Sequence, residues 1–157
     1  MRTLRRGLSA SVLALAVAAA AASAQPDAIA VSRAWTRAVG AAAPTTAGYM
    51  TLRNHGASPD RLVGAETPAA RSVEIHEQRM EDGVMRMRPL SGGIALPPGE
   101  AVTLAPGGTH LMLVGPTRVF ARGERVPLAL RFERAGEVRV ELSVEAAGAR
   151  RPAHAGH

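Results

Sequence analysis

Four side chains stand out because their types and spacing could bind a soft metal ion. His76 and Met87 are separated by ten residues, and Asp82-Gly83 between them is typical of a two-residue hairpin turn. Because side chains alternate along both arms of such a hairpin, His76 and Met87 become diagonal neighbours on one face. His110 and Met112 are two residues apart in a short apolar segment, so they also share a face.

The same alternation defines a wider face around the first pair. If Asp82-Gly83 forms the turn, Met80 lies opposite Met85, and Gln78 lies opposite Met87. The side chains predicted to share this face of the hairpin are His76, Gln78, Met80, Met85 and Met87.

A purely structural interpretation competes with the metal site. Methionines on a strand face usually fill a core, and a single histidine on a strand is usually structural. Of the six methionines, Met1 opens the chain and Met50 stands alone in an early segment. The other four lie near His76 or His110. Spacing alone leaves both interpretations open.

The absence of cysteine narrows the chemistry. The sequence contains none, which excludes disulfides, thiolate nucleophiles, thiolate zinc sites, iron–sulfur clusters and cysteine-ligated blue-copper centres. Any soft-metal site must therefore be built from methionine and histidine. A thioether needs no deprotonation and cannot be lost to a disulfide, although it can oxidise to a sulfoxide.

Short β-rich segments must position these residues. Gly, Pro and Asn/Asp turns separate them, and no stretch after residue 24 has a convincing helical period. The composition predicts an all-β, antiparallel β-sandwich or Greek-key barrel with a single domain. The predicted strands are 29–35, 46–53, 60–66, 72–80, 84–88, 101–104, 110–114, 126–133 and 137–144.

Both ends of the chain differ from this pattern. Residues 1–24 combine a basic head, an alanine-rich apolar run and Ala22-Ser23-Ala24, which are the features of a cleaved signal peptide. Export without stable membrane insertion is expected, followed by a domain over residues 25–145. Residues 146–157 have little apolar surface to bury and are expected to form a flexible tail that carries His154 and His157.

Charge and motif content disfavour several function classes. The net charge of +6 includes three arginines of the signal segment, so the exported chain carries only about +3. With four Phe, Trp and Tyr residues in total, no base-stacking surface is expected, and nucleic acid is not an expected partner. An enzyme is also disfavoured, because there is no nucleophile elbow, HExxH motif or grouped acid–base carboxylates.

The histidine and methionine spacing resembles the signature of the periplasmic copper chaperone family called PCuA(C). That signature is a His, ten residues, a Met, about twenty-one residues, and then His-x-Met. His76, Met87 and His110-Leu111-Met112 match it, with a spacer over 88–109 that is one residue longer. The extra residue is expected in one of the two Pro/Gly turns, 97–99 or 106–108. Further similarity covers segments at 34–37, 47–52, 73–77, 80–88 and 106–113.

The resemblance implies a fold, a ligand set and a partner. It implies a cupredoxin-like β-sandwich that binds Cu(I) through His76, Met87, His110 and Met112. It also implies a periplasmic monomer that delivers copper to an acceptor protein, either the cytochrome c oxidase subunit with the dinuclear copper centre or its assembly factor. Thioethers favour Cu(I), and a ligand set without thiolate would allow an acceptor with cysteines to take the ion.

The remaining candidate ligands have weaker support. Met80 and Met85 are interpreted as packing at the rim of the site, with an accessory or entry role as the alternative. His154 and His157 are interpreted as a solvated end or a weak second metal site, and His55 as a turn residue. The competing hypothesis for the whole chain is a metal-free β-sandwich binding module of the cell envelope.

Overall fold

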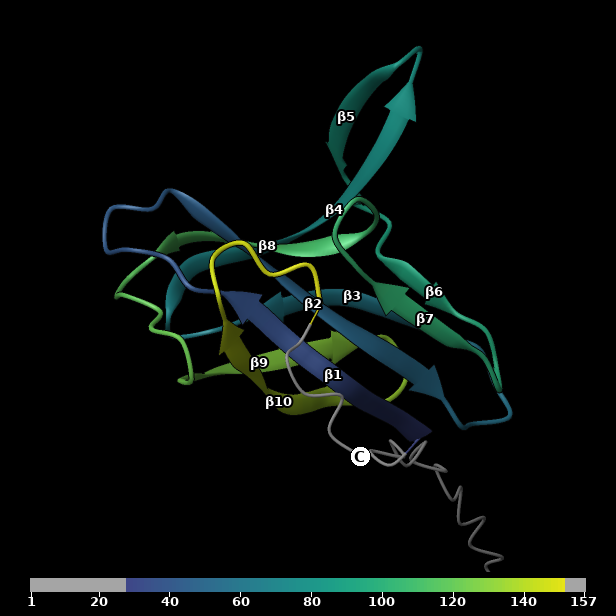
Figure 1. Ribbon diagram of the computed structural model, residues 1–157. Helices are drawn as coiled ribbons and strands as arrows, with labels where there is room; N and C mark the ends of the chain where they lie inside the picture. The colour runs from purple at the N-terminus through teal and green to yellow at the C-terminus, as the bar shows by residue number, and fades with distance from the viewer. Residues whose placement is uncertain (1–27, 152–157) are drawn as a thin grey trace, which may run out of the picture.

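The computed structural model describes residues 28–151, whose regular secondary structure is almost entirely β-strand (Figure 1). No helix within this range is long and apolar enough to cross a membrane. The predicted signal peptide and the end of the tail, with His154 and His157, lie outside the described residues. The ten strands are β1 (Ile29–Arg37), β2 (Thr45–Asn54), β3 (Asp60–Glu66), β4 (Ala70–Glu81), β5 (Val84–Pro89), β6 (Ile94–Leu96), β7 (Ala101–Leu104), β8 (His110–Pro116), β9 (Arg125–Phe132) and β10 (Gly136–Glu145).

The strands form one hydrogen-bonded sheet in the order β5-β4-β8-β2-β1-β10-β9-β3-β6, with β7 paired to β2. Neighbouring strands are antiparallel apart from β1 and β10, which run parallel. This parallel pair departs from the wholly antiparallel arrangement expected from the sequence. It joins the first and last strands, which no hairpin connects.

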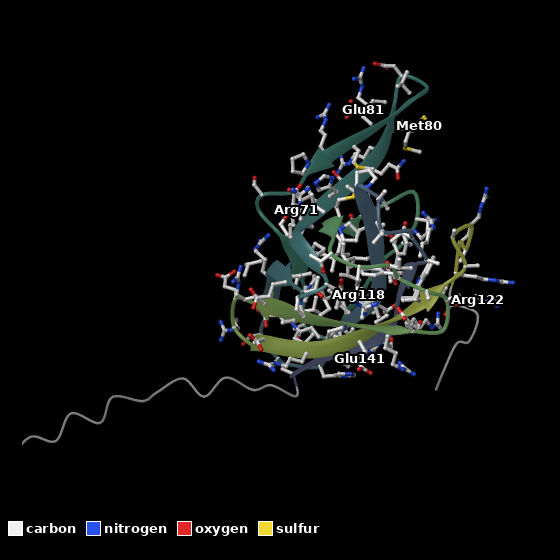
Figure 2. The ribbon with its side chains drawn as sticks, turned by 90° about the vertical axis from the view of Figure 1, so that its left-hand side faces the viewer. Arg71, Met80, Glu81, Arg118, Arg122 and Glu141 are labelled. Atoms are coloured by element: carbon white, nitrogen blue, oxygen red, sulfur yellow. The ribbon has the colours of Figure 1, made fainter. Side chains whose placement is uncertain are left out.

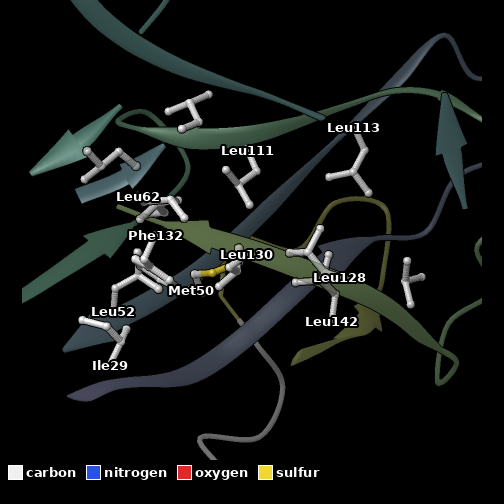
Figure 3. Packing of buried hydrophobic residues seen from close by; sticks show 14 of the residues in the cluster. Ile29, Met50, Leu52, Leu62, Leu111, Leu113, Leu128, Leu130, Phe132 and Leu142 are labelled. Carbon is white, nitrogen blue, oxygen red and sulfur yellow. The ribbon is translucent and has the colours of Figure 1, made fainter. Parts of the chain in front are cut away.

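Alternation along the strands places the core. In β9, Val126, Leu128, Leu130 and Phe132 are buried and the residues between them are more exposed, which is the period-two pattern of a half-buried strand. Leu128, Leu130 and Phe132 belong to the same buried cluster as Leu111 and Leu113 of β8, on the opposite half of the sheet (Figure 3). One apolar core therefore lies between two sheet halves, and the predicted β-sandwich is confirmed.

One strand was not predicted. β6 has only three residues between two turns, too few to show a period. Its Ile94 and Leu96 are nonetheless buried, and it pairs with β3. The segment therefore contributes to the core although its sequence has no pattern that predicts a strand.

The hairpin of β4 and β5 projects from the body of the sandwich (Figure 1). Its turn residues Asp82 and Gly83 have φ angles of 52° and 77°, as a type I′ turn requires of both central residues. The predicted register is confirmed, with Met80 opposite Met85 and Gln78 opposite Met87. Every residue of β5 is exposed, so this arm adds nothing to the core.

Candidate metal centre

The two halves of the histidine–methionine motif meet at β4. His76 of β4 pairs with Pro89 of β5 on one side and with His110 of β8 on the other. The two imidazole ring centroids lie 6.0 Å apart. The spacer over 88–109 thus begins beside one edge of β4 and ends beside the other edge, so its extra residue does not separate the two pairs.

The predicted ligands all lie on one face of the three strands. Cross-strand partners point to the same side of a sheet, and so do alternate residues of one strand. His76 and His110 are direct partners, Met112 is the partner of Glu74, and Met87 is the partner of Gln78. Because positions 74, 76 and 78 of β4 alternate on one face, the two imidazoles and two thioethers share that face.

The backbone orients the ring of His110. This side chain is 3% exposed, and its Nδ1 lies 3.0 Å from the carbonyl oxygen of Gly108. A carbonyl only accepts hydrogen bonds, so Nδ1 carries the proton and donates it. The lone pair is then on Nε2. Metal-binding histidines commonly use one nitrogen for such a bond and the other for the metal.

A carboxylate orients the ring of His76. Its Nε2 lies 2.8 Å from Oε2 of Glu74, which is two residues earlier on the same face of β4. An ionised carboxylate accepts, so Nε2 donates and the lone pair is on Nδ1. Among the described residues, His76 Nδ1 is the one buried side-chain nitrogen or oxygen with no hydrogen-bond partner. A buried, unpaired acceptor is costly unless a ligand satisfies it.

Exposure increases across the four side chains. His110 is buried, the side chain of His76 is 14% exposed, and Met112 is partly buried. Met87, on the projecting hairpin, is 48% exposed. The arrangement therefore offers two oriented nitrogen donors at its base, with one thioether beside them and another open to solvent.

An aromatic wall supports the base of the site. Ring centroids are 6.3 Å apart between His110 and Tyr49, and 4.6 Å apart between Tyr49 and Trp35. A β-bulge in β1, at Arg33 with φ 52°, shifts the register so that Trp35 pairs with Tyr49. Burial raises the pKa of Tyr49, while the guanidinium of Arg37, 5.4 Å from the Tyr49 ring, acts in the opposite direction. The wall thus places the neutral phenol of Tyr49 next to the ring of His110.

The accessory candidates Met80 and Met85 lie farther out on the projecting hairpin. They are 63% and 44% exposed, so the body of the sandwich does not bury them, and their role at the rim or entry of the site stays a prediction. The alternation that placed them on the ligand face does not show whether another layer covers that face. His55 is exposed beside β2, and its backbone N–H donates to the carbonyl of Ala28.

The sequence analysis missed two supporting residues. Glu74 and the carbonyl of Gly108 fix the two imidazoles, and the Gly108 carbonyl also accepts the backbone N–H of Gln78. The pattern Glu-x-His on a predicted strand would have indicated Glu74, because positions two apart share a face. The position of a backbone carbonyl, such as that of Gly108, cannot be predicted from side-chain spacing in this way.

Substituting Glu74 by alanine should weaken metal binding about 10-fold, because loss of an outer partner of a ligating histidine costs 10–100-fold. A loss at the low end of this range is expected, because Glu74 is 51% exposed and water can take its place as the hydrogen-bond acceptor. Glu74→Gln keeps an acceptor and should restore most of the affinity, as measured by competition with a chromophoric chelator. Glu77→Ala is the matched control, because Glu77 pairs with Arg79 on the opposite face. An equal loss in both alanine variants would contradict this role for Glu74.

Harder donors do not assemble elsewhere in the described part of the chain. Over residues 28–151, no three His, Asp or Glu side chains are grouped so that they could hold a metal ion. At the face of β4, β5 and β8, the soft donors beside the two imidazoles are the thioethers of Met87 and Met112. This mixture of imidazole and thioether suits a soft, monovalent cation.

Sequence comparisons connect the chain to a family of putative lipoproteins. Residues 29–144 match the family model LpqE-like, described as "Putative lipoprotein LpqE-like". The chain is also 32% identical over 126 residues to the "Putative lipoprotein Lxx21020" of Leifsonia xyli subsp. xyli, covering 80% of this chain and 75% of the relative. The family match includes the three strands of the candidate centre.

Structural comparisons connect it to copper-binding domains. The copper-bound PCuAC domain from PmoF2 is similar with a TM-score of 0.65 and 34% identity, over 76% of this chain and 93% of that one. The Cu(I) form of DR1885 from Deinococcus radiodurans is similar with a TM-score of 0.55 and 34% identity, over 71% and 74% of the two chains. The fold is thus the cupredoxin-like β-sandwich shared with these domains.

Proposed function

We propose, from the premise that this chain belongs to the LpqE-like family, that it carries one Cu(I) ion and transfers it to another protein. The ion would be held by His76, Met87, His110 and Met112. Support comes from the similar solved structures, which include a copper-bound PCuAC domain and a Cu(I) form. A copper chaperone is the function that these similarities favour.

One observation carries the proposal on this chain's own residues. His76 and His110 are direct cross-strand partners, and each ring donates one N–H to a protein acceptor. Each ring therefore keeps one nitrogen lone pair free, and that of His76 is buried without a partner. Two oriented, unprotonated nitrogens beside two thioethers match the donor preference of Cu(I).

The charge of the ligand set suits a carrier. Two neutral imidazoles and two thioethers hold a monovalent cation without bringing anionic ligands together. No thiolate is present, because the sequence has no cysteine. An acceptor with cysteine thiolates would therefore bind the ion more strongly, and Cu(I) could move to it through intermediates in which both proteins contribute ligands.

Exposure suggests the order in which the ligands leave. Met87 is 48% exposed on the projecting hairpin, whereas His110 is 3% exposed. An incoming ligand can displace the Met87 thioether first and the imidazoles last. Met87 is also flexible, because a methionine side chain has three rotatable bonds.

The cellular setting is part of the proposal. The resemblance to PCuA(C) chaperones and the signal-like segment at residues 1–24 support a periplasmic carrier. The acceptor we propose is the dinuclear copper subunit of cytochrome c oxidase or the assembly factor that serves it. A ligand set without cysteine suits an oxidising compartment, where free thiols are readily oxidised.

The test is anaerobic titration of the apo protein with Cu(I) in competition with a chromophoric chelator. We expect a tight one-to-one complex, and X-ray absorption should report two sulfur and two nitrogen ligands. Absence of a tight complex would favour the metal-free binding module. A complex with only oxygen and nitrogen ligands would also contradict the proposed site.

A further inference from the structure

Exposed apolar side chains gather on the β4–β5 hairpin. Six large hydrophobic residues are exposed in the described part of the chain, and four of them lie on this hairpin. Three of the four are methionines. They are Met80, Met85 and Met87, which are 63%, 44% and 48% exposed.

The two faces of the hairpin differ in chemistry. One face carries ion pairs, with Arg79 and Glu77 at 2.8 Å and Arg88 and Glu81 at 2.7 Å. Figure 2 shows Met80 and Glu81 on opposite sides of the hairpin. The in-register pairing of β4 with β5 has no bulge, so the three methionines share the face opposite the charges. The apolar exposure is therefore confined to one side.

Packing does not explain these methionines. Burial of apolar surface is what makes a core methionine stabilising, and Met80 keeps 63% of its surface in water. Methionine also lacks the β-branch that favours strand positions. An exposed thioether is a soft, uncharged donor that can bind a metal at any pH.

The register places the three sulfur-bearing side chains together. Met80 and Met85 are direct cross-strand partners, whose Cβ atoms lie about 4.5–5.5 Å apart in such pairs. Met87 is two residues from Met85 on the same face, toward His76. Flexible methionine side chains at these positions can converge on one ion.

We propose that Met80, Met85 and Met87 form a second, weaker Cu(I) site that captures the ion and passes it to the main centre. This inference rests on the proposed function of the main centre. Met87 belongs to both sites, so the ion moves without leaving the protein. Cu–S bonds to Met80 and Met85 break as Cu–N bonds to His76 and His110 and the Cu–S bond to Met112 form. Copper stays monovalent, and neutral imidazoles release no proton.

The first test removes the main centre and keeps the hairpin. In a His76→Leu/Met112→Leu variant with a native circular dichroism spectrum, Cu(I) or the redox-inert probe Ag(I) should still shift the methyl NMR signals of Met80, Met85 and Met87. This residual binding should depend on pH much less than binding in the native protein does, because thioethers do not titrate and only one of the two imidazoles remains. The absence of any methyl shift would overturn the second site.

The second test measures capture in the otherwise native protein. Met80→Leu/Met85→Leu keeps the apolar surface but removes two sulfurs, and it should slow Cu(I) uptake from a small chelator about 10-fold. Val84→Leu, at the tip of the same hairpin, is the control and should not slow uptake. A small chelator needs no protein docking surface, so a slower rate reports loss of sulfur. Equal rates in all three proteins would overturn the capture role.

The two proposals can fail separately. Tight binding at the main centre with no methyl shift in the His76→Leu/Met112→Leu variant would reject the hairpin site alone. Methyl shifts at the hairpin of the native protein, without a mixed sulfur–nitrogen complex, would reject the main centre and its function as a carrier.

Discussion

Substituting Met112 by leucine should lower the affinity for Cu(I) at least about 100-fold and leave the fold intact. The expected loss is large because even an outer partner of a metal ligand is worth 10–100-fold, and Met112 would be a direct ligand. Leucine has a similar volume, and such exchanges usually cost less than about 1.5 kcal/mol of stability. Competition with a chromophoric chelator measures the affinity, and thermal unfolding measures the fold.

The chain provides a matched control for this exchange. Met50 of β2 is 1% exposed within the core (Figure 3), away from the ligand face. Met50→Leu should lower the stability to thermal unfolding somewhat but leave the Cu(I) affinity unchanged. If Met112→Leu binds copper as tightly as Met50→Leu, the Met112 thioether is not a ligand.

Local sequence patterns predicted the hairpin well. The Asp82-Gly83 pair requires two positive φ angles and therefore one turn type, and the turn fixes which residues face each other. The diagonal relation of His76 and Met87 follows from that register alone. This half of the candidate centre could be derived without the rest of the fold.

The other half depends on strand order, which local patterns do not encode. β8 lies next to β4 although more than thirty residues separate His76 from His110 in the sequence. Only the resemblance to the PCuA(C) signature suggested that these two residues meet. The parallel pairing of β1 with β10 was missed for the same reason, because both pairings join distant segments.

Burial was the second quantity that the sequence could not supply. Alternation assigned Met80 and Met85 to the ligand face, but their exposure depends on the projection of the hairpin beyond the sandwich. Glu74 was missed because the histidine–methionine spacing points to direct ligands and not to the groups that orient them. The structure shows it as the hydrogen-bond partner of His76.

These findings link the fold to transfer of the ion. Groups of the sandwich orient the imidazoles, namely the Gly108 carbonyl, Glu74 and the wall of Tyr49 and Trp35. The thioether of Met87 lies instead on an arm that contributes nothing to the core. A preorganised base would favour binding, while a mobile ligand at the open side would favour fast exchange.

The affinity for Cu(I) should fall steeply as the pH is lowered. A protonated imidazole has no lone pair for the metal, so protons compete with Cu(I) at His76 and His110. Once both rings are protonated in the free protein, binding releases two protons, and affinity drops up to about 100-fold per pH unit. The measurement is chelator competition at a series of pH values, with the chelator's own pH dependence calibrated.

The slope of Cu(I) affinity against pH distinguishes the ligating histidines from the other histidines. In His76→Leu only one ring would remain, so the affinity that is left should change at most about 10-fold per pH unit. His55→Asn alters an exposed turn residue away from the site and should keep the full slope of the native protein. A flat profile in the native protein would mean that the methionines bind Cu(I) without the imidazoles. In that case the unpaired nitrogen of His76 would need another explanation.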